Sequence, residues 1–183
     1  IDQVSAMAEQ FEPRRVIRDE AGRVVESVDN EVEDAYFAHF RFASGAVGMV
    51  FGGVAGHGEP TALEAGAVIY GTKGCIKGGQ VILDGGQRSP GPELFAQEAP
   101  PALKERWFPR GVLDSFGLQW LDFLRSVASG KPMETDGREG LRDLACSFAI
   151  LESAALNQPV LVNDVLAGRV RAYQQEIDEH YGL

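Results

Sequence analysis

The sequence predicts an α+β domain with a large, open, mainly antiparallel sheet and helices packed on one face of that sheet. In the first half of the chain, apolar residues alternate with polar ones at the period of a β-strand. Short turns join these runs, whereas parallel neighbours would need crossovers of about a dozen residues. In the second half, apolar residues recur at helical spacing behind capping residues. Strands first and helices later are typical of the α+β class.

The strands are predicted from alternating runs that end at turn residues. They are Asp2–Phe11, Val32–Phe42, Ala46–Val54, Leu63–Tyr70, Cys75–Lys77 and Val81–Leu83. The turn Ser44-Gly45 joins the second and third strands into a hairpin. A polar segment with a turn at Glu20-Ala21-Gly22 separates the first two strands. On the second strand, one face carries Tyr36, Ala38, Phe40 and Phe42, and the other carries Ala35, Phe37, His39 and Arg41.

The stretch Gly85–Leu113 is rich in proline and has no clean periodicity. A structureless segment of that length inside a compact domain is usually functional or part of an interface. We therefore expect a functional or interface loop there. Trp107, Phe108 and Pro109 near its end indicate that the loop packs against something.

Three helices are predicted in the remaining chain, each from a capping residue before a run at helical spacing. Their limits are Asp114 or Ser115 to Ser129, Asp136 to Asn157, and Asp164 to Ile177, with a brief extended segment at Val160–Val162 before the last helix.

Composition narrows the class of partners. The chain has 183 residues, a net charge of −10 and no basic run interleaved with aromatic residues, so we expect no nucleic-acid partner. No apolar run approaches the roughly 18 residues that span a bilayer, and no signal-peptide pattern opens the chain. We therefore expect a cytoplasmic protein with no membrane association. Cys75 and Cys146 are far apart in the sequence and are interpreted as buried thiols. A disulfide between them is the alternative.

The length suits one domain over residues 1–183. The chain begins with Ile1 and not with Met, so we expect it to be a piece of a longer protein.

The stretch GGVAGHGEP, at Gly52–Pro60, has the composition of a phosphate-binding loop. Its register fails, because a G-x-G-x-x-G motif starting at Gly56 would need glycine where Thr61 stands, and a strand is predicted next. His57, flanked by glycines at a strand end, is instead the sharpest single candidate for a site. It could hydrogen-bond a substrate hydroxyl or accept a proton. A solvent-exposed loop histidine is the simpler alternative.

Other patterns that carry chemistry are missing from the sequence. The histidines His39, His57 and His180 are too scattered to indicate a metal site. No G-x-S-x-G motif and no activated cysteine supports nucleophilic hydrolysis. Lys131-Pro132 stands between two predicted helices and is interpreted as a helix stop.

Several stretches together resemble the C-terminal domain of the glucose–fructose oxidoreductase/inositol dehydrogenase/MocA (Gfo/Idh/MocA) family. They are VEDAYFAHFRFASGAVGMVFGG, IYGTKGCIKGGQVILDGG and GKPMETDGREGLRDLACSFAILESAALNQPVLV, and their order and spacing cover nearly the whole chain. The resemblance implies an NAD(P)-dependent oxidoreductase acting on sugars, polyols and related carbonyl compounds. It also implies a Rossmann domain upstream of Ile1 that holds NAD or NADP and the catalytic lysine. No catalytic, cofactor-binding or metal-binding residue is then expected in this chain.

In such an enzyme this chain would supply the wall of the substrate pocket. We expect His57 and Glu59 to line that pocket, with Trp107 as an aromatic platform and Arg110 as a donor to an anion or hydroxyl. Lys73 is a further candidate.

The expected partners are a small-molecule substrate, the missing Rossmann domain and further copies of the chain. The copies would form a homodimer or tetramer through the sheet face of Phe37, His39 and Arg41. Alone, the chain should neither bind NAD(P) nor turn over substrate. Two alternatives stay open: a stand-alone dimeric ligand-binding or interaction domain without redox activity, and a hydrolase or lyase on an α+β scaffold.

Overall fold

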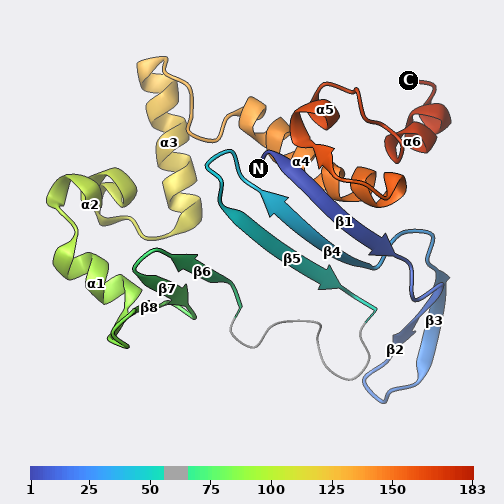
Figure 1. Ribbon diagram of the computed structural model, residues 1–183, viewed down its shortest axis with the longest axis horizontal. Helices are drawn as coiled ribbons and strands as arrows, with labels where there is room; N and C mark the ends of the chain where they lie inside the picture. Colours follow the sequence, from blue (N-terminus) through green and yellow to red (C-terminus); the bar gives the residue numbers. More distant parts are fainter. Residues whose placement is uncertain (56–65) are drawn as a thin grey trace. The chain divides into compact units, whose positions relative to one another are not determined.

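The computed structural model describes residues 1–55 and 66–183 and has the predicted α+β class (Figure 1). Every strand pairing in these residues is antiparallel, which agrees with the mainly antiparallel sheet that the short turns predict. The chain divides into two compact units. Unit 1 comprises Ile1–Thr61 and Gly137–Leu183, and unit 2 comprises Ala62–Asp136.

Unit 1 is built on a four-stranded sheet with the strand order β10-β1-β4-β5. Its strands are β1 (Gln3–Glu9), β4 (Ala35–Arg41), β5 (Val47–Gly53) and β10 (Val160–Leu161), with a separate ribbon of β2 (Arg14–Arg18) and β3 (Val24–Asp29). Its helices are α4 (Gly137–Leu156), α5 (Val162–Leu166) and α6 (Gln174–Tyr181). The hairpin β4–β5 turns at the predicted Ser44-Gly45, where Gly45 has a φ of 89° that favours glycine.

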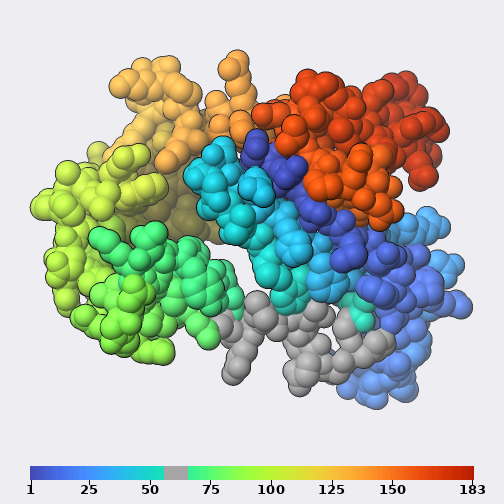
Figure 2. Space-filling view, viewed as in Figure 1, coloured from blue at the N-terminus to red at the C-terminus, as the bar shows by residue number. Residues whose placement is uncertain are grey.

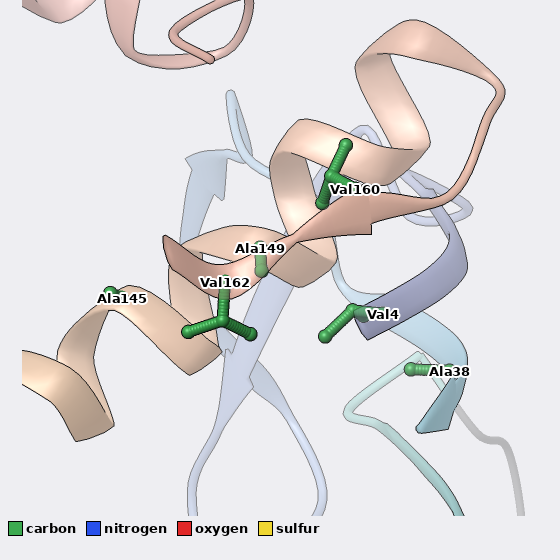
Figure 3. Close-up of a cluster of buried hydrophobic side chains, with 6 residues drawn as sticks. All are labelled: Val4, Ala38, Ala145, Ala149, Val160 and Val162. Atoms are coloured by element: carbon green, nitrogen blue, oxygen red, sulfur yellow. The ribbon is translucent and has the colours of Figure 1, made fainter. Parts of the chain in front are cut away.

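The core of unit 1 lies between one face of this sheet and helix α4 (Figure 3). Strand alternation turns Val4 and Ala38 toward the helix, and α4 presents Ala145 and Ala149 to them. Val160 and Val162 complete the cluster. The small alanine side chains allow the helix to approach the sheet closely. This arrangement confirms the prediction that helices cover one face of the sheet.

Two buried polar residues of α4 tie the helix to its neighbours. The Glu152 carboxylate accepts hydrogen bonds from the backbone N–H groups of Tyr173, at 3.0 Å, and Gln174, at 3.1 Å. These two donors open α6 and have no partner within that helix. The Ser153 hydroxyl accepts from the Ala6 N–H at 2.9 Å and donates to the Gln158 carbonyl at 2.8 Å, so it joins α4 to β1.

Unit 2 contains a second four-stranded sheet and three helices. Its strands, in spatial order, are β6 (Val68–Gly71), β7 (Gly74–Lys77), β8 (Gln80–Leu83) and β9 (Arg88–Pro90). Its helices are α1 (Gly91–Glu98), α2 (Pro101–Trp107) and α3 (Ser115–Ser129), with a 3₁₀ helix, η1, at Pro109–Gly111.

Helix α3 has both predicted boundaries. The Asp114 carboxylate caps it by accepting from the Gly117 N–H at 2.6 Å. Gly130 ends it in the left-handed conformation, with a φ of 68°.

The prediction of a loop over Gly85–Leu113 is wrong, because β9, α1, α2 and η1 occupy most of that stretch. The prolines that interrupt its periodicity stand in the first turns of the helices. Pro92 is the second residue of α1 and Pro101 is the first of α2. At these positions the missing proline N–H has no partner to lose, so proline starts these helices instead of breaking them.

The prediction of one helix from Asp164 through Ile177 is also wrong, because α5 and α6 are separate. Gly168 follows α5 with a φ of 67°, a conformation that a continuing helix cannot contain. The Asp164 carboxylate does not act as the predicted cap. It accepts from Nε of Arg169 at 2.8 Å, beyond the turn.

The segment described as polar between the first two predicted strands is the β2–β3 hairpin. The turn at Glu20-Ala21-Gly22 is where we expected it, and Gly22 has a φ of 78°. Arginines and acids between the valines conceal the strand alternation. Of the predicted strand Leu63–Tyr70, residues 63–65 lie outside the described residues. Gly66 and Ala67 are described but precede the strand, which begins at Val68.

Candidate functional site

Two of the five predicted pocket residues, His57 and Glu59, lie outside the described residues. Their assignment to the pocket wall stays a prediction. The other three, Lys73, Trp107 and Arg110, all belong to unit 2.

Lys73 stands in the turn between β6 and β7, at a hollow on the sheet of unit 2. The hollow has a volume of about 290 Å³, close to the lower limit of roughly 300 Å³ for small-molecule sites. Thr72, Lys73 and Cys75 contribute polar or sulfur atoms, and Ile76 and Val81 contribute apolar walls. This lining suits a small molecule with one apolar face and an anionic or hydroxyl group near the lysine.

Gly74, where the β6–β7 turn enters β7, is one of the residues that line this hollow. Gly74 has a φ of 150°, and a Cβ atom there would collide with the carbonyl oxygen of Ile82. Only glycine therefore allows β7 to approach β8 this closely. The same turn holds Lys73, whose carbonyl oxygen accepts from the Asp84 N–H at 3.2 Å.

Trp107 and Arg110 lie on consecutive helical segments. Trp107 ends α2 with 47% of its surface exposed, and the Arg106 guanidinium lies over its ring, 5.3 Å from the centroid. The indole is therefore held by a cation–π contact while part of it faces solvent. Arg110 lies three residues on, in η1, and is exposed.

The backbone of Arg110 is unusual. Its φ of 57° lies in the left-handed region that residues other than glycine, asparagine and aspartate rarely adopt. Pro109, which is buried, precedes it, and Gly111, with a φ of 72°, follows. The Arg110 N–H donates to Oε2 of Glu105 at 3.3 Å. Outliers of this kind cluster at ligand sites, and Arg110 therefore stays a candidate site residue.

Trp107 and Arg110 lie on one short segment, at the end of α2 and in η1. Lys73 has no hydrogen bond or ion pair with either side chain among the described residues. The chain therefore offers two separate groups of candidates within unit 2: the hollow beside Lys73, and the pair on α2 and η1.

The hollow itself was not predicted from the sequence. Its apolar wall comes from Ile69, Ile76 and Val81, which stand directly opposite one another on β6, β7 and β8. The signal that would have found it is this cross-strand row of β-branched residues beside the turn GTKG.

Two of the groups with shifted pKa values, Asp34 and Tyr173, serve structural positions. Hydrogen bonds from the backbone N–H of Phe11 and Glu12, together with the Arg15 guanidinium, lower the pKa of Asp34. Burial, together with a hydrogen bond to Glu33, raises the pKa of Tyr173. Both residues belong to unit 1, and neither lines the hollow of unit 2.

The described residues offer neither a metal site nor a membrane-spanning helix. In residues 1–55 and 66–183, no group of three or more histidine, cysteine, aspartate or glutamate side chains could hold a metal ion. No helix in that part of the chain is long and apolar enough to cross a membrane. Both cysteines are free and half-buried.

Comparison with known proteins shows to which protein family this chain belongs. The model for the C-terminal alpha/beta domain of an oxidoreductase family matches residues 1–162. The chain therefore belongs to the Gfo/Idh/MocA oxidoreductase family, and it corresponds to the C-terminal domain of that family. A search of curated proteins found no match.

Solved structures share the fold at low sequence identity. An oxidoreductase domain protein from Kribbella flavida has a TM-score of 0.59 and 21% identity over 88% of this chain and 46% of its own. An oxidoreductase from Agrobacterium radiobacter, in complex with NAD⁺, L-tartaric acid and magnesium, has a TM-score of 0.54 and 20% identity over 89% and 44%. A levoglucosan dehydrogenase, in complex with NADH and L-sorbose, has a TM-score of 0.55 and 21% identity over 88% and 44%. The chain thus spans less than half the length of these proteins.

Proposed function

We propose that this chain is the substrate-side domain of an NAD(P)-dependent dehydrogenase that acts on a sugar, polyol or related carbonyl compound. The family match over residues 1–162 is the observation that carries the proposal. The solved proteins of the same fold include one bound to NADH and L-sorbose. We expect the enzyme to work in the cytoplasm.

The residues of this chain do not fit a nucleotide cofactor. A dinucleotide fingerprint needs a strand, a G-x-G-x-x-G turn and a helix in succession, and the one glycine-rich candidate, at Gly52–Pro60, fails in register. In the proposed enzyme a separate Rossmann domain holds NAD or NADP. This chain then binds and orients the substrate and excludes water from it.

The proposed substrate contacts follow from the chemistry of each side chain. The exposed indole of Trp107 offers a flat apolar surface to the C–H face of a sugar ring. Arg110 and Lys73 donate hydrogen bonds to hydroxyl or carboxylate groups. His57 and Glu59 complete the pocket wall as proposals made from sequence.

Binding of the nucleotide tests the proposed division of labour. We expect no heat in calorimetry when the 183 residues alone are titrated with NAD⁺ or NADP⁺, and we expect binding by the protein encoded by the complete reading frame. The codons upstream of Ile1 should encode a G-x-G-x-x-G turn and a Glu-Lys-Pro segment. If both are missing, or if the 183 residues bind NAD(P) alone, the stand-alone ligand-binding domain becomes the better explanation.

Kinetics of the complete enzyme test the assignment of Arg110. Replacing Arg110→Ala removes a charged donor to the substrate, and such hydrogen bonds contribute about 1.5–3 kcal/mol. We expect KM to rise about tenfold or more while the melting temperature changes little. Arg125→Ala on α3 is the matched control and should leave KM unchanged. An unchanged KM for Arg110→Ala would remove this residue from the proposed pocket.

A further inference from the structure

The β2–β3 ribbon is the part of unit 1 with the least support from its own chain. It is a two-stranded sheet that pairs with no third strand among the described residues, and in the sequence it lies between β1 and β4 (Figure 1). Its atoms, in lighter blue, are visible on the face drawn in Figure 2. Five large apolar side chains on it are between 46% and 62% exposed: Val16, Ile17, Val24, Val25 and Val28. A two-stranded ribbon is marginally stable in water on its own. The register divides these apolar side chains: Val16 and Val24 lie on one face, whereas Ile17 and Val28 lie on the other. Apolar side chains exposed on a sheet face are candidates for a contact surface.

The charges of the ribbon are divided between its strands. Strand β2 contains three arginines and no acid, whereas β3 contains one glutamate and one aspartate and no base. Over residues 13–30, four arginines balance four acids, although the whole chain has a net charge of −10. The ribbon is therefore a neutral segment on which two copies of an acidic chain can meet without net repulsion.

Strand register places one set of these residues on a single face. Arg14 pairs with Asp29, Val16 with Ser27, and Arg18 with Val24, and residues directly opposite in an antiparallel pair point the same way. This surface, which we call the Arg14 face, carries a cation at one strand and an anion at the other. The side chains of Arg14 and Asp29 are 67% and 81% exposed, and their atoms Nε and Oδ1 are 3.8 Å apart.

We propose that the Arg14 face stacks on the same face of a second copy of this chain. A twofold axis parallel to the strands, between the two ribbons, lays the arginine strand of each copy over the acidic strand of the other. Since Arg14 and Asp29 are at the same level of the ribbon, Arg14 of each copy then meets Asp29 of the other. The same stacking of the two ribbons also covers Val16 and Val24. Both contacts occur twice, as an isologous interface requires.

The ribbon is one part of a larger contact between the same two copies. A stable interface buries about 800 Å² per partner, more than a ribbon of this length offers. The inference therefore rests on the proposed association through the face of Phe37, His39 and Arg41. The ribbons add affinity and fix the orientation of the two copies.

A charge exchange between copies tests the contact. We use the full chain with Arg14→Asp in one variant and Asp29→Arg in another, and we measure dissociation constants by sedimentation. Each variant alone places like charges against each other across the twofold axis, so each should self-associate about tenfold more weakly than the unaltered chain at low salt. An equimolar mixture should regain the affinity as a heterodimer, because the two acidic side chains of the first variant then meet the two arginines of the second.

The mixture separates this contact from a local effect on the ribbon. Both variants also disrupt the pair Arg14–Asp29 within their own chain, and mixing cannot repair that loss. Glu20→Arg, in the turn of the ribbon, is the charge control and should change the affinity little. If the unaltered chain dimerises but the variants match it, or if the mixture does not recover, the ribbon contact is wrong and the sheet-face association stands. If the unaltered chain stays monomeric, both are wrong.

Discussion

At the scale of single residues, Asp34 is the polar group that holds unit 1 together where the ribbon leaves the sheet. It is 4% exposed and accepts from the backbone N–H of Phe11, at 2.8 Å, and of Glu12, at 2.9 Å. Nη2 of Arg15, on β2, lies 3.5 Å from Oδ2 of the same carboxylate. One ionised side chain therefore fixes both the end of β1 and the base of the ribbon.

These contacts make the stability of the protein depend on pH. The pKa of Asp34 is lowered in the folded state, first by the hydrogen bond from Phe11, relative to about 3.9 in an unfolded chain. The stabilisation is therefore fully present above about pH 4 and is lost as the pH falls through the lowered folded-state pKa. Asp34→Asn should lower the urea midpoint at pH 7 and reduce the loss of stability on acidification.

Urea unfolding at pH 7 and pH 3 checks this prediction, with Asp143→Asn on the exposed surface of α4 as the control. The control should follow the unaltered chain at both pH values. Equal midpoints for Asp34→Asn and the unaltered chain at pH 7 would show that the charge of Asp34 contributes nothing to stability.

At the scale of secondary-structure elements, the sequence predicts those strands and helices whose ends are marked by turn or capping residues. The hairpin β4–β5 follows from alternation on both sides of Ser44-Gly45, and α3 follows from the cap at Asp114 and the stop at Gly130. The prolines in the first turns of α1 and α2 interrupt the sequence periodicity as a break would, although they start helices. Their effect depends on where each helix begins, and no local pattern states that.

In the candidate site, too, some features follow from residue type and others depend on how the chain folds. Side-chain chemistry predicts Trp107, Arg110 and Lys73 as candidates from the sequence, and all three side chains are exposed in the structure. The hollow beside Lys73 was missed, because it depends on pairing between β6, β7 and β8. The left-handed backbone of Arg110 is not predictable from residue type either, because arginine rarely adopts a positive φ.

At the scale of the whole molecule, the four-stranded sheet of unit 1 has one covered face and one open face. Helix α4 covers the face of Val4 and Ala38. On the other face, cross-strand register gathers Met7, Phe37 and Phe51 in one row, and the rings of Phe37 and Phe51 stack with centroids 6.0 Å apart. Met49, in the next row beside His39, is 68% exposed.

An apolar face of this kind is costly to leave in water, and the charges on it lie at its margins. Glu9 and Arg41 stand at the ends of β1 and β4, so no aspartate, glutamate, lysine or arginine lies in the rows of Phe37 and His39 between them. A twofold axis through that centre would place Met49 and Phe37 of one copy against the same face of another and exclude water from both. The apolar area removed from water would then favour a dimer, and one charge at its centre should oppose it.

We therefore expect the chain to be a dimer at micromolar concentration and Met49→Asp to weaken that dimer by about a hundredfold, because two carboxylates would be buried without partners near the axis. Light scattering over a dilution series measures the shift. Leu183→Asp places the same charge on an apolar residue that is 88% exposed at the C-terminus, and it should leave the mass unchanged. A monomeric mass for the unaltered chain, or a dimer that tolerates Met49→Asp, would mean that this face serves another purpose than self-association.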